Sequence, residues 1–153
     1  MNALRRNVLK GAAGAGTVAV AVAAGLLKPT QAFAIAPRSA YDARTLADAM
    51  KGMGSPAESK DIVIKAPDIA ENGAVVPVEI TSTLAGVTNI ALLAEKNNTP
   101  LVADFDLAGG TEAFVSTRIK MGQTSMVRAV VTAGGKTYTT TKEVKVTIGG
   151  CGG

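Results

Sequence analysis

The chain has 153 residues, a formal net charge of +4, and only 3% aromatic residues. Four of its 16 basic residues (Arg5, Arg6, Lys10 and Lys28) lie in residues 1–34, which contain no acidic residue. The remainder therefore carries 12 basic and 12 acidic residues. Because a nucleic-acid-binding surface needs clustered surplus positive charge, this balance argues against one.

The first 34 residues have the order of an export signal. A basic start is followed by the apolar run from Gly11 to Leu27 and then by the small-residue site Ala32-Phe33-Ala34. Cleavage after Ala34 is favoured over cleavage after Ala36, because Pro37 would otherwise follow the cut bond. The run has 17 residues rich in Ala and Gly, which is short for a membrane span. We expect removal of residues 1–34, with an N-terminal membrane anchor as the alternative.

The paired arginines predict the export route. Arg5-Arg6-Asn7-Val8-Leu9-Lys10 resembles the twin-arginine motif, although Leu4 and Val8 depart from its usual residues. This route moves folded proteins, which usually carry a cofactor or a bound partner. Since the chain has no His and one Cys, a partner is the better explanation. We expect a periplasmic protein with no membrane attachment after processing.

The next segment predicts one short helix. Ser39-Ala40-Tyr41-Asp42 has the form of a capping box. Apolar residues follow at Leu46, Met50 and Met53, with Gly52 as a stop. We expect a helix over residues 40–51.

The rest of the chain predicts strands. Apolar residues alternate or form short runs between turn sequences such as Asn72-Gly73 and Gly134-Gly135, and the latter pair favours a tight hairpin. The predicted strands span residues 62–66, 75–80, 90–95, 101–106, 114–121, 125–133 and 136–148. Seven short strands indicate a mainly β fold, an immunoglobulin-like antiparallel β-sandwich, over residues 35–148. Pro77 would place its strand at an edge or a bulge.

Most catalytic and metal sites lack their usual residues. Without His, the common triads and most zinc or copper sites cannot form, and no glycine-rich loop follows a strand and opens a helix. Four methionines have the spacing of ordinary core or interface residues rather than a soft-metal site: Met50, Met53, Met121 and Met126. Asp104 and Asp106 alternate on one strand and would suit an acid–base pair, although such residues more often form a solvated rim. We expect no enzyme activity of its own, no metal and no cofactor.

The C-terminal residues 149–153 predict a flexible arm. Val144, Val146 and Ile148 alternate with polar residues and anchor the last strand as far as Ile148. Beyond them Cys151 is surrounded by glycines only, Gly149, Gly150, Gly152 and Gly153. Such a tail cannot bury a thiol, and an exposed lone thiol in an oxidising compartment implies a role. Three residues past Ile148 reach roughly 10 Å, so Cys151 suits a covalent carrying point.

Four segments resemble the SoxY family, the sulfur-carrier subunits of the periplasmic thiosulfate-oxidising Sox system. They are the terminal Gly-Gly-Cys-Gly-Gly and residues 69–78, 117–121 and 142–148. The resemblance implies that Cys151 carries thiosulfate-derived sulfur as an S-thiosulfonate or persulfide, within a SoxYZ heterodimer formed with SoxZ.

It also implies transient contacts with the cytochrome SoxXA, the hydrolase SoxB and the sulfane dehydrogenase SoxCD. A secreted structural or interaction domain with an intermolecular disulfide through Cys151 is the alternative. A disulfide-linked dimer is expected on either interpretation.

Overall fold

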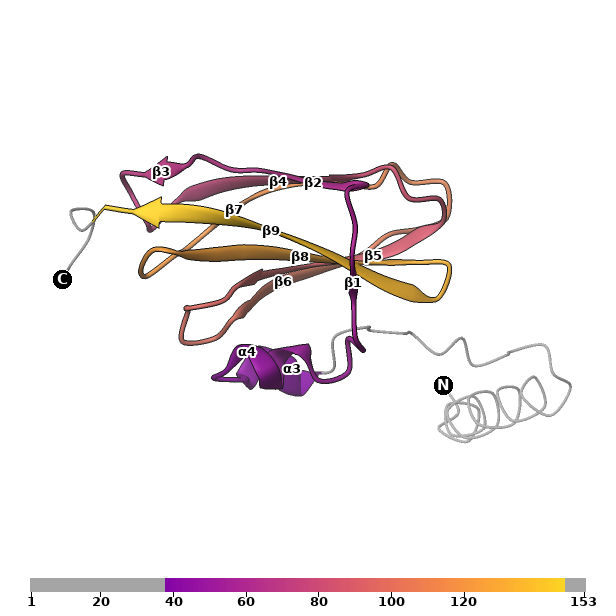
Figure 1. Cartoon of the computed structure of the whole chain (residues 1–153), viewed down its shortest axis with the longest axis horizontal. Helices are drawn as coiled ribbons and strands as arrows, with labels where there is room; N and C mark the ends of the chain where they lie inside the picture. The colour runs from indigo at the N-terminus through magenta and orange to yellow at the C-terminus, as the bar shows by residue number, and fades with distance from the viewer. Residues whose placement is uncertain (1–37, 148–153) are drawn as a thin grey trace, which may run out of the picture. The chain divides into compact units, whose positions relative to one another are not determined.

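The computed structural model describes residues 38–147, which form two β-sheets and two short helices (Figure 1). The predicted export signal, its Arg5-Arg6 pair, the cleavage after Ala34 and the arm at residues 149–153 lie outside the described residues and stay predictions.

The larger sheet has the strand order β1-β9-β8-β5-β6, with β3 also paired to β9. Its strands are β1 (Ala57–Glu58), β3 (Ile69–Ala70), β5 (Val87–Ala94), β6 (Leu101–Asp106), β8 (Ser125–Ala133) and β9 (Lys136–Val146). The smaller sheet has the order β2-β4-β7, formed by β2 (Ile62–Lys65), β4 (Val76–Ser82) and β7 (Phe114–Ile119). The two sheets lie face to face (Figure 1).

Alternating apolar side chains fill the space between the sheets. Val76, Val78 and Ile80 of β4 are fully buried while their strand neighbours are not, because successive side chains of a strand point to opposite faces. They belong to one core cluster with Ile90 and Leu92 of β5. The described residues thus form the predicted mainly β sandwich, and that prediction is confirmed.

The strand pairing adds a feature to the antiparallel prediction. The ladders of β2, β4, β5, β6, β7 and β8 are antiparallel, as expected, and so is the β8–β9 hairpin. The two-residue strands β1 and β3, however, both pair with β9 in parallel. Neither was predicted, because two residues show no periodicity. Together with β8 they give β9 partners on both of its sides.

Pro77 lies in a different setting from the one predicted. Its strand β4 is the middle strand of the smaller sheet and its two ladders have no register shift, so the prediction of an edge strand or a bulge is wrong. Pairing with β2 begins only at Glu79, opposite Lys65, whereas Pro77 is paired with Arg118 of β7 alone. The missing N–H of proline is therefore placed where β4 has a single neighbour.

The predicted helix over residues 40–51 is two helices, α3 (Arg38–Asp42) and α4 (Leu46–Met50). The break falls at Thr45, whose extended backbone (φ −127°, ψ 151°) and side chain cap α4 by accepting the Asp48 N–H at 3.1 Å. The working N-cap is thus Thr45 rather than Ser39, because its hydroxyl meets an otherwise unpaired first-turn N–H.

The helices cover the outer face of the larger sheet (Figure 1). Ala40, Ala49 and Met53 pack with Ala91 and Leu93 of β5 in a second apolar cluster. Strand β5 is consequently buried on both faces from Ile90 to Ala94. In the part of the chain that the structure describes, no helix is both long and apolar enough to span a bilayer.

Candidate functional site

The end of β9 is the point from which the predicted carrier arm leaves the sandwich. Residues Lys145 and Val146 pair in parallel with Ile69 and Ala70 of β3. Beyond the ladder, the Thr147 N–H donates to the Ala70 carbonyl oxygen at 3.2 Å. The backbone is therefore hydrogen-bonded up to Thr147, four residues before Cys151.

The Thr124 side chain also holds the end of β9, through hydrogen bonds to the backbone of Val146. The Val146 N–H donates to Thr124 Oγ1 at 3.0 Å, and the Thr124 hydroxyl lies 3.4 Å from the Val146 carbonyl oxygen that it donates to. Thr124 belongs to the loop between β7 and β8. Two separate segments, β3 and this loop, thus hold the last described residues of the chain. We call residues 144–147 the arm root.

A glycine lets a third segment pack against the arm root. The Met121 N–H donates to the Gly73 carbonyl oxygen at 2.7 Å. A Cβ atom at Gly73 would lie 2.4 Å from the Met121 carbonyl oxygen and 2.7 Å from Val146 Cγ1. Both distances are far below van der Waals contact, so only glycine permits this approach.

The predicted attachment residues are not among those the structure describes. Cys151 and its flanking Gly149, Gly150, Gly152 and Gly153 follow the arm root. The predicted alternation before them is confirmed as far as it can be followed, since Val144 is fully buried, Val146 is half-buried, and Lys145 and Thr147 are exposed. The described chain before the arm is thus a β-strand as far as Val146.

Asp104 and Asp106 come together, but around a neutral partner that sequence reasoning missed. Asn89 Nδ2 donates to Asp104 Oδ1 at 2.7 Å and to Asp106 Oδ1 at 3.0 Å. Asn89 is only 1% exposed, and a buried amide without partners is costly. The two carboxylates therefore satisfy the amide nitrogen of this buried side chain, which supports their interpretation as rim residues, whereas Asn89 Oδ1 has no hydrogen-bond partner among the described residues.

The negative charges of the same two carboxylates also act on the phenol of Tyr41 in α3. Burial, and then the negative charges of Asp104 and Asp106, raise the pKa of the Tyr41 phenol above its ordinary value of 10.0. The only signal in the sequence for this arrangement is a polar Asn inside the apolar strand at residues 87–94.

The methionines that belong to the apolar clusters lie in two different places. Met50 and Met53 belong to the helix cluster, whereas Met121 lies in the core between the sheets. The described residues also hold no group of three or more His, Cys, Asp or Glu side chains positioned to bind a metal ion.

Sequence reasoning also missed a polar hollow at the arm end of the sandwich. Its volume is about 560 Å³, and it lies between the β5–β6 hairpin and the β7–β8 loop. Six of the lining residues are polar or basic and the others are two aliphatic residues and a glycine: Lys96, Asn97, Asn98, Thr99, Leu101, Val102, Lys120, Gly122 and Gln123. We call this feature the lysine hollow.

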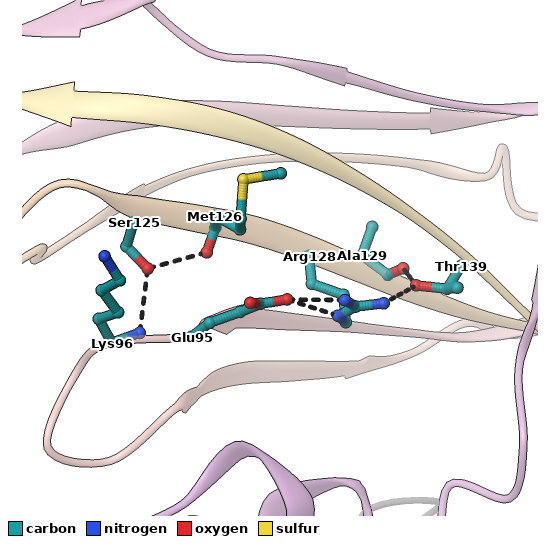
Figure 2. Close-up of polar contacts among 7 residues, drawn as sticks. All are labelled: Glu95, Lys96, Ser125, Met126, Arg128, Ala129 and Thr139. Carbon is teal, nitrogen blue, oxygen red and sulfur yellow. Dashed lines mark hydrogen bonds and ion pairs between the residues drawn. The ribbon is translucent and has the colours of Figure 1, made fainter.

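Hydrogen bonds hold the hairpin side of the lysine hollow against β8 (Figure 2). The Lys96 N–H donates to Ser125 Oγ at 3.0 Å. Next to it, Arg128 Nη2 and Glu95 Oε1 form an ion pair at 2.7 Å, with both side chains about three-quarters or more buried. Figure 2 shows the Lys96 side chain pointing away from this ion pair.

Comparison with known proteins shows the family. The family model described as "Sulfur oxidation protein SoxY" matches residues 47–151, well over half of the chain. The chain belongs to the SoxY family. Its matched region includes the whole sandwich, the arm root and Cys151.

Solved structures agree with this membership. The structure of the sulfur carrier protein SoxY from Chlorobium limicola f thiosulfatophilum is 46% identical, with a TM-score of 0.61, over 68% of this chain and 97% of that one. The superoxide reductase (neelaredoxin) of Ignicoccus hospitalis is 17% identical with a TM-score of 0.50, over 56% of this chain and 80% of that one. That second likeness shows the fold alone. A comparison with curated proteins finds no match.

Proposed function

We propose that this protein is a covalent carrier of sulfur substrates, with Cys151 as the attachment residue and residues 149–153 as the arm that presents it. The observation that carries the proposal is a family match that extends to Cys151, in a chain with no other cysteine. The 46% identical relative is described as a sulfur carrier protein, which supports the same role.

The chemistry starts with an oxidative coupling. The Cys151 thiol joins thiosulfate through a new S–S bond, giving a cysteine S-thiosulfonate, and one proton and two electrons leave. A partner with redox-active haem, a SoxXA-like cytochrome, would accept the electrons. This chain contributes the nucleophilic sulfur and the reach of a glycine arm.

The next step is hydrolysis. Water attacks the sulfur of the terminal sulfonate group, sulfate and two protons leave, and the cysteine persulfide anion remains on the arm. A SoxB-like hydrolase would catalyse this step, and a SoxCD-like dehydrogenase would oxidise the remaining sulfur. Because glycines carry no Cβ, the arm suits narrow active sites of several enzymes.

The assembly and location belong to the same proposal. The protein would work in the periplasm as a SoxYZ heterodimer, after twin-arginine export of the folded pair and cleavage after Ala34. The Arg5-Arg6 pair supports this route. A partner carried along would explain the export of a folded chain that has no His and one Cys.

The decisive measurement is the mass of the C-terminal peptide from cells grown on thiosulfate. Proteolysis after Lys145 releases residues 146–153, and we expect masses of thiosulfate-derived sulfur on Cys151 that a reductant removes. Cys151→Ser should keep the same thermal unfolding midpoint and abolish thiosulfate oxidation by the reconstituted system. A disulfide-linked dimer as the sole native form, without any adduct, would refute the carrier function.

A further inference from the structure

We propose that the lysine hollow is a docking site for the anionic sulfonate end of the cargo on Cys151. The inference rests on the proposed function, because it takes a cysteine-bound oxoanion as the ligand. It adds a resting position on the carrier itself for that ligand.

The charges of the hollow select an anion. Lys96 and Lys120 contribute two ammonium groups, Asn98 and Thr99 contribute further polar side chains, and none of the nine lining residues is acidic. Among residues 38–147, neither lysine forms an ion pair. Ammonium groups bind sulfonate oxygens through charge-assisted hydrogen bonds, which are stronger than neutral ones.

Local hydrogen bonds hold the walls of the hollow in place. Asn97 Nδ2 donates to the Lys120 carbonyl oxygen at 2.7 Å, and the Gly122 N–H donates to Asn97 Oδ1 at 3.2 Å. Gln123 Nε2 donates to the Lys96 carbonyl oxygen at 3.2 Å. The hairpin and the loop are thus joined to each other, so that both lysines extend from a preorganised frame rather than from independent loops.

The hollow is within reach of the arm. Gly122 and Gln123 line it, and the next residue, Thr124, exchanges two hydrogen bonds with Val146 of the arm root. Cys151 is four positions beyond Thr147, a reach of up to roughly 14 Å at about 3.3–3.6 Å per residue. In Figure 1 the β5–β6 hairpin, the β7–β8 loop and the end of β9 all lie at the left.

Tethering makes a shallow site sufficient. A group on a short flexible linker has an effective concentration in the millimolar range near its own domain. A site that binds free thiosulfate too weakly to matter in solution can therefore hold the same group when it is attached to Cys151. The docked group would also dissociate easily, and a carrier that serves several enzymes requires this.

The test prepares the adduct without any partner enzyme. Tetrathionate converts the Cys151 thiolate to the S-thiosulfonate with release of one thiosulfate, so the S–S bond formed replaces the one broken. Amide chemical shifts of the purified protein are then compared between the free thiol, this anionic adduct and the neutral adduct made with iodoacetamide. We expect the anionic adduct alone to shift the amides of the hollow, among them Lys96, Gly122 and Gln123.

Matched variants assign the shifts to the two lysines. Lys96→Gln with Lys120→Gln should remove most of the shift, whereas Lys60→Gln with Lys136→Gln removes the same charge elsewhere and should leave it. High salt should weaken docking in the parent protein, because about 1 M salt shortens the Debye length to about 3 Å. A Cys151→Ser variant titrated with free thiosulfate separates a tethered ligand from a free anion, and we expect at most weak shifts there.

Shifts confined to the tail, or equal shifts with the neutral adduct, would overturn the docking site. The outcome is separable from that of the carrier function. Docking of the prepared adduct in a protein that carries no sulfur in thiosulfate-grown cells would refute the carrier function and keep the site. Sulfur on Cys151 in cells, with no response in the hollow, would do the reverse.

Discussion

Gly73 is the residue at which the arm root depends most directly on the absence of a side chain. Its position is set by the Asn72-Gly73 turn, in which the Ala74 N–H donates to Asn72 Oδ1 at 2.9 Å. The turn was predictable from the sequence. Its contact with Val146 was not, because that contact joins segments more than 70 residues apart.

Gly73→Ala should destabilise the fold by roughly 1–3 kcal/mol, the range of overpacking in a well-packed site. The added Cβ would meet the Met121 carbonyl oxygen at 2.4 Å, so the backbone at the arm root must shift. Urea unfolding followed by circular dichroism measures the loss. Gly109→Ala is the control, because a Cβ there has no neighbour within 4 Å. Equal unfolding midpoints for the two variants would contradict the packing argument.

Asn89 shows why the carboxylate pair could be noticed but not explained from the sequence. Asp104 and Asp106 alternate, so their common face was evident. Their partner depends on the register of β5 against β6, in which Asn89 lies opposite Asp106 and Ala91 lies opposite Asp104. Register is set by the side chains of the whole sheet and by turn geometry, and local pattern alone does not reveal it.

At the level of elements, strands with a clear period of two were predictable almost to the residue. Strands β6 and β8 have the predicted bounds, and β2 and β4 differ by one or two residues. The helical segment was less predictable, because the apolar spacing of Leu46, Met50 and Met53 does not show that a separate helix begins after Thr45. Ser39, the predicted cap, lies inside α3, whereas the Thr45 hydroxyl caps α4.

The Glu95–Arg128 ion pair links the β5–β6 hairpin to β8, and its energy can be measured. We expect a coupling of about 1–2 kcal/mol between Glu95→Ala and Arg128→Ala, above the range of exposed pairs and below that of fully buried ones. Arg128 Nη1 also lies 3.4 Å from Thr139 Oγ1, which further fixes the guanidinium group (Figure 2). A double-mutant cycle in urea gives the coupling directly.

The matched comparison is the Lys142–Asp68 pair, where Nζ and Oδ1 are 3.1 Å apart but the Asp68 side chain is 89% exposed. Its coupling should be under about 0.5 kcal/mol, since solvent screens the charges. If both pairs gave the same coupling, burial would not be the cause of the difference.

On the scale of the whole molecule, the apolar core and the residues proposed to bind sulfur substrates lie in different parts of the fold. The core fills the space between the sheets, and α3 and α4 cover the other face of β5. The arm root and the lysine hollow lie at the end of the sandwich that holds the β5–β6 hairpin and the β7–β8 loop. Substitutions of the exposed Lys96 and Lys120 and of Cys151 are therefore expected to change sulfur binding without changing stability, whereas Gly73→Ala changes stability first.

The helix-covered face also makes the stability of the molecule depend on pH in the alkaline range. Burial, followed by the charges of Asp104 and Asp106, raises the pKa of Tyr41 above its ordinary value of 10.0. Above about pH 10 the unfolded chain therefore loses the phenol proton while the folded chain keeps it. The contribution of Tyr41 to stability is complete below that pH and is lost as the pH rises through the folded-state pKa.

Unfolding of the parent and of Tyr41→Phe in urea, compared from pH 8 to pH 11, should show a steeper fall of the unfolding free energy for the parent. Asp106→Asn removes one of the two charges and should reduce the difference. A difference between parent and Tyr41→Phe that stays constant across this range would show that the phenol does not couple to the fold.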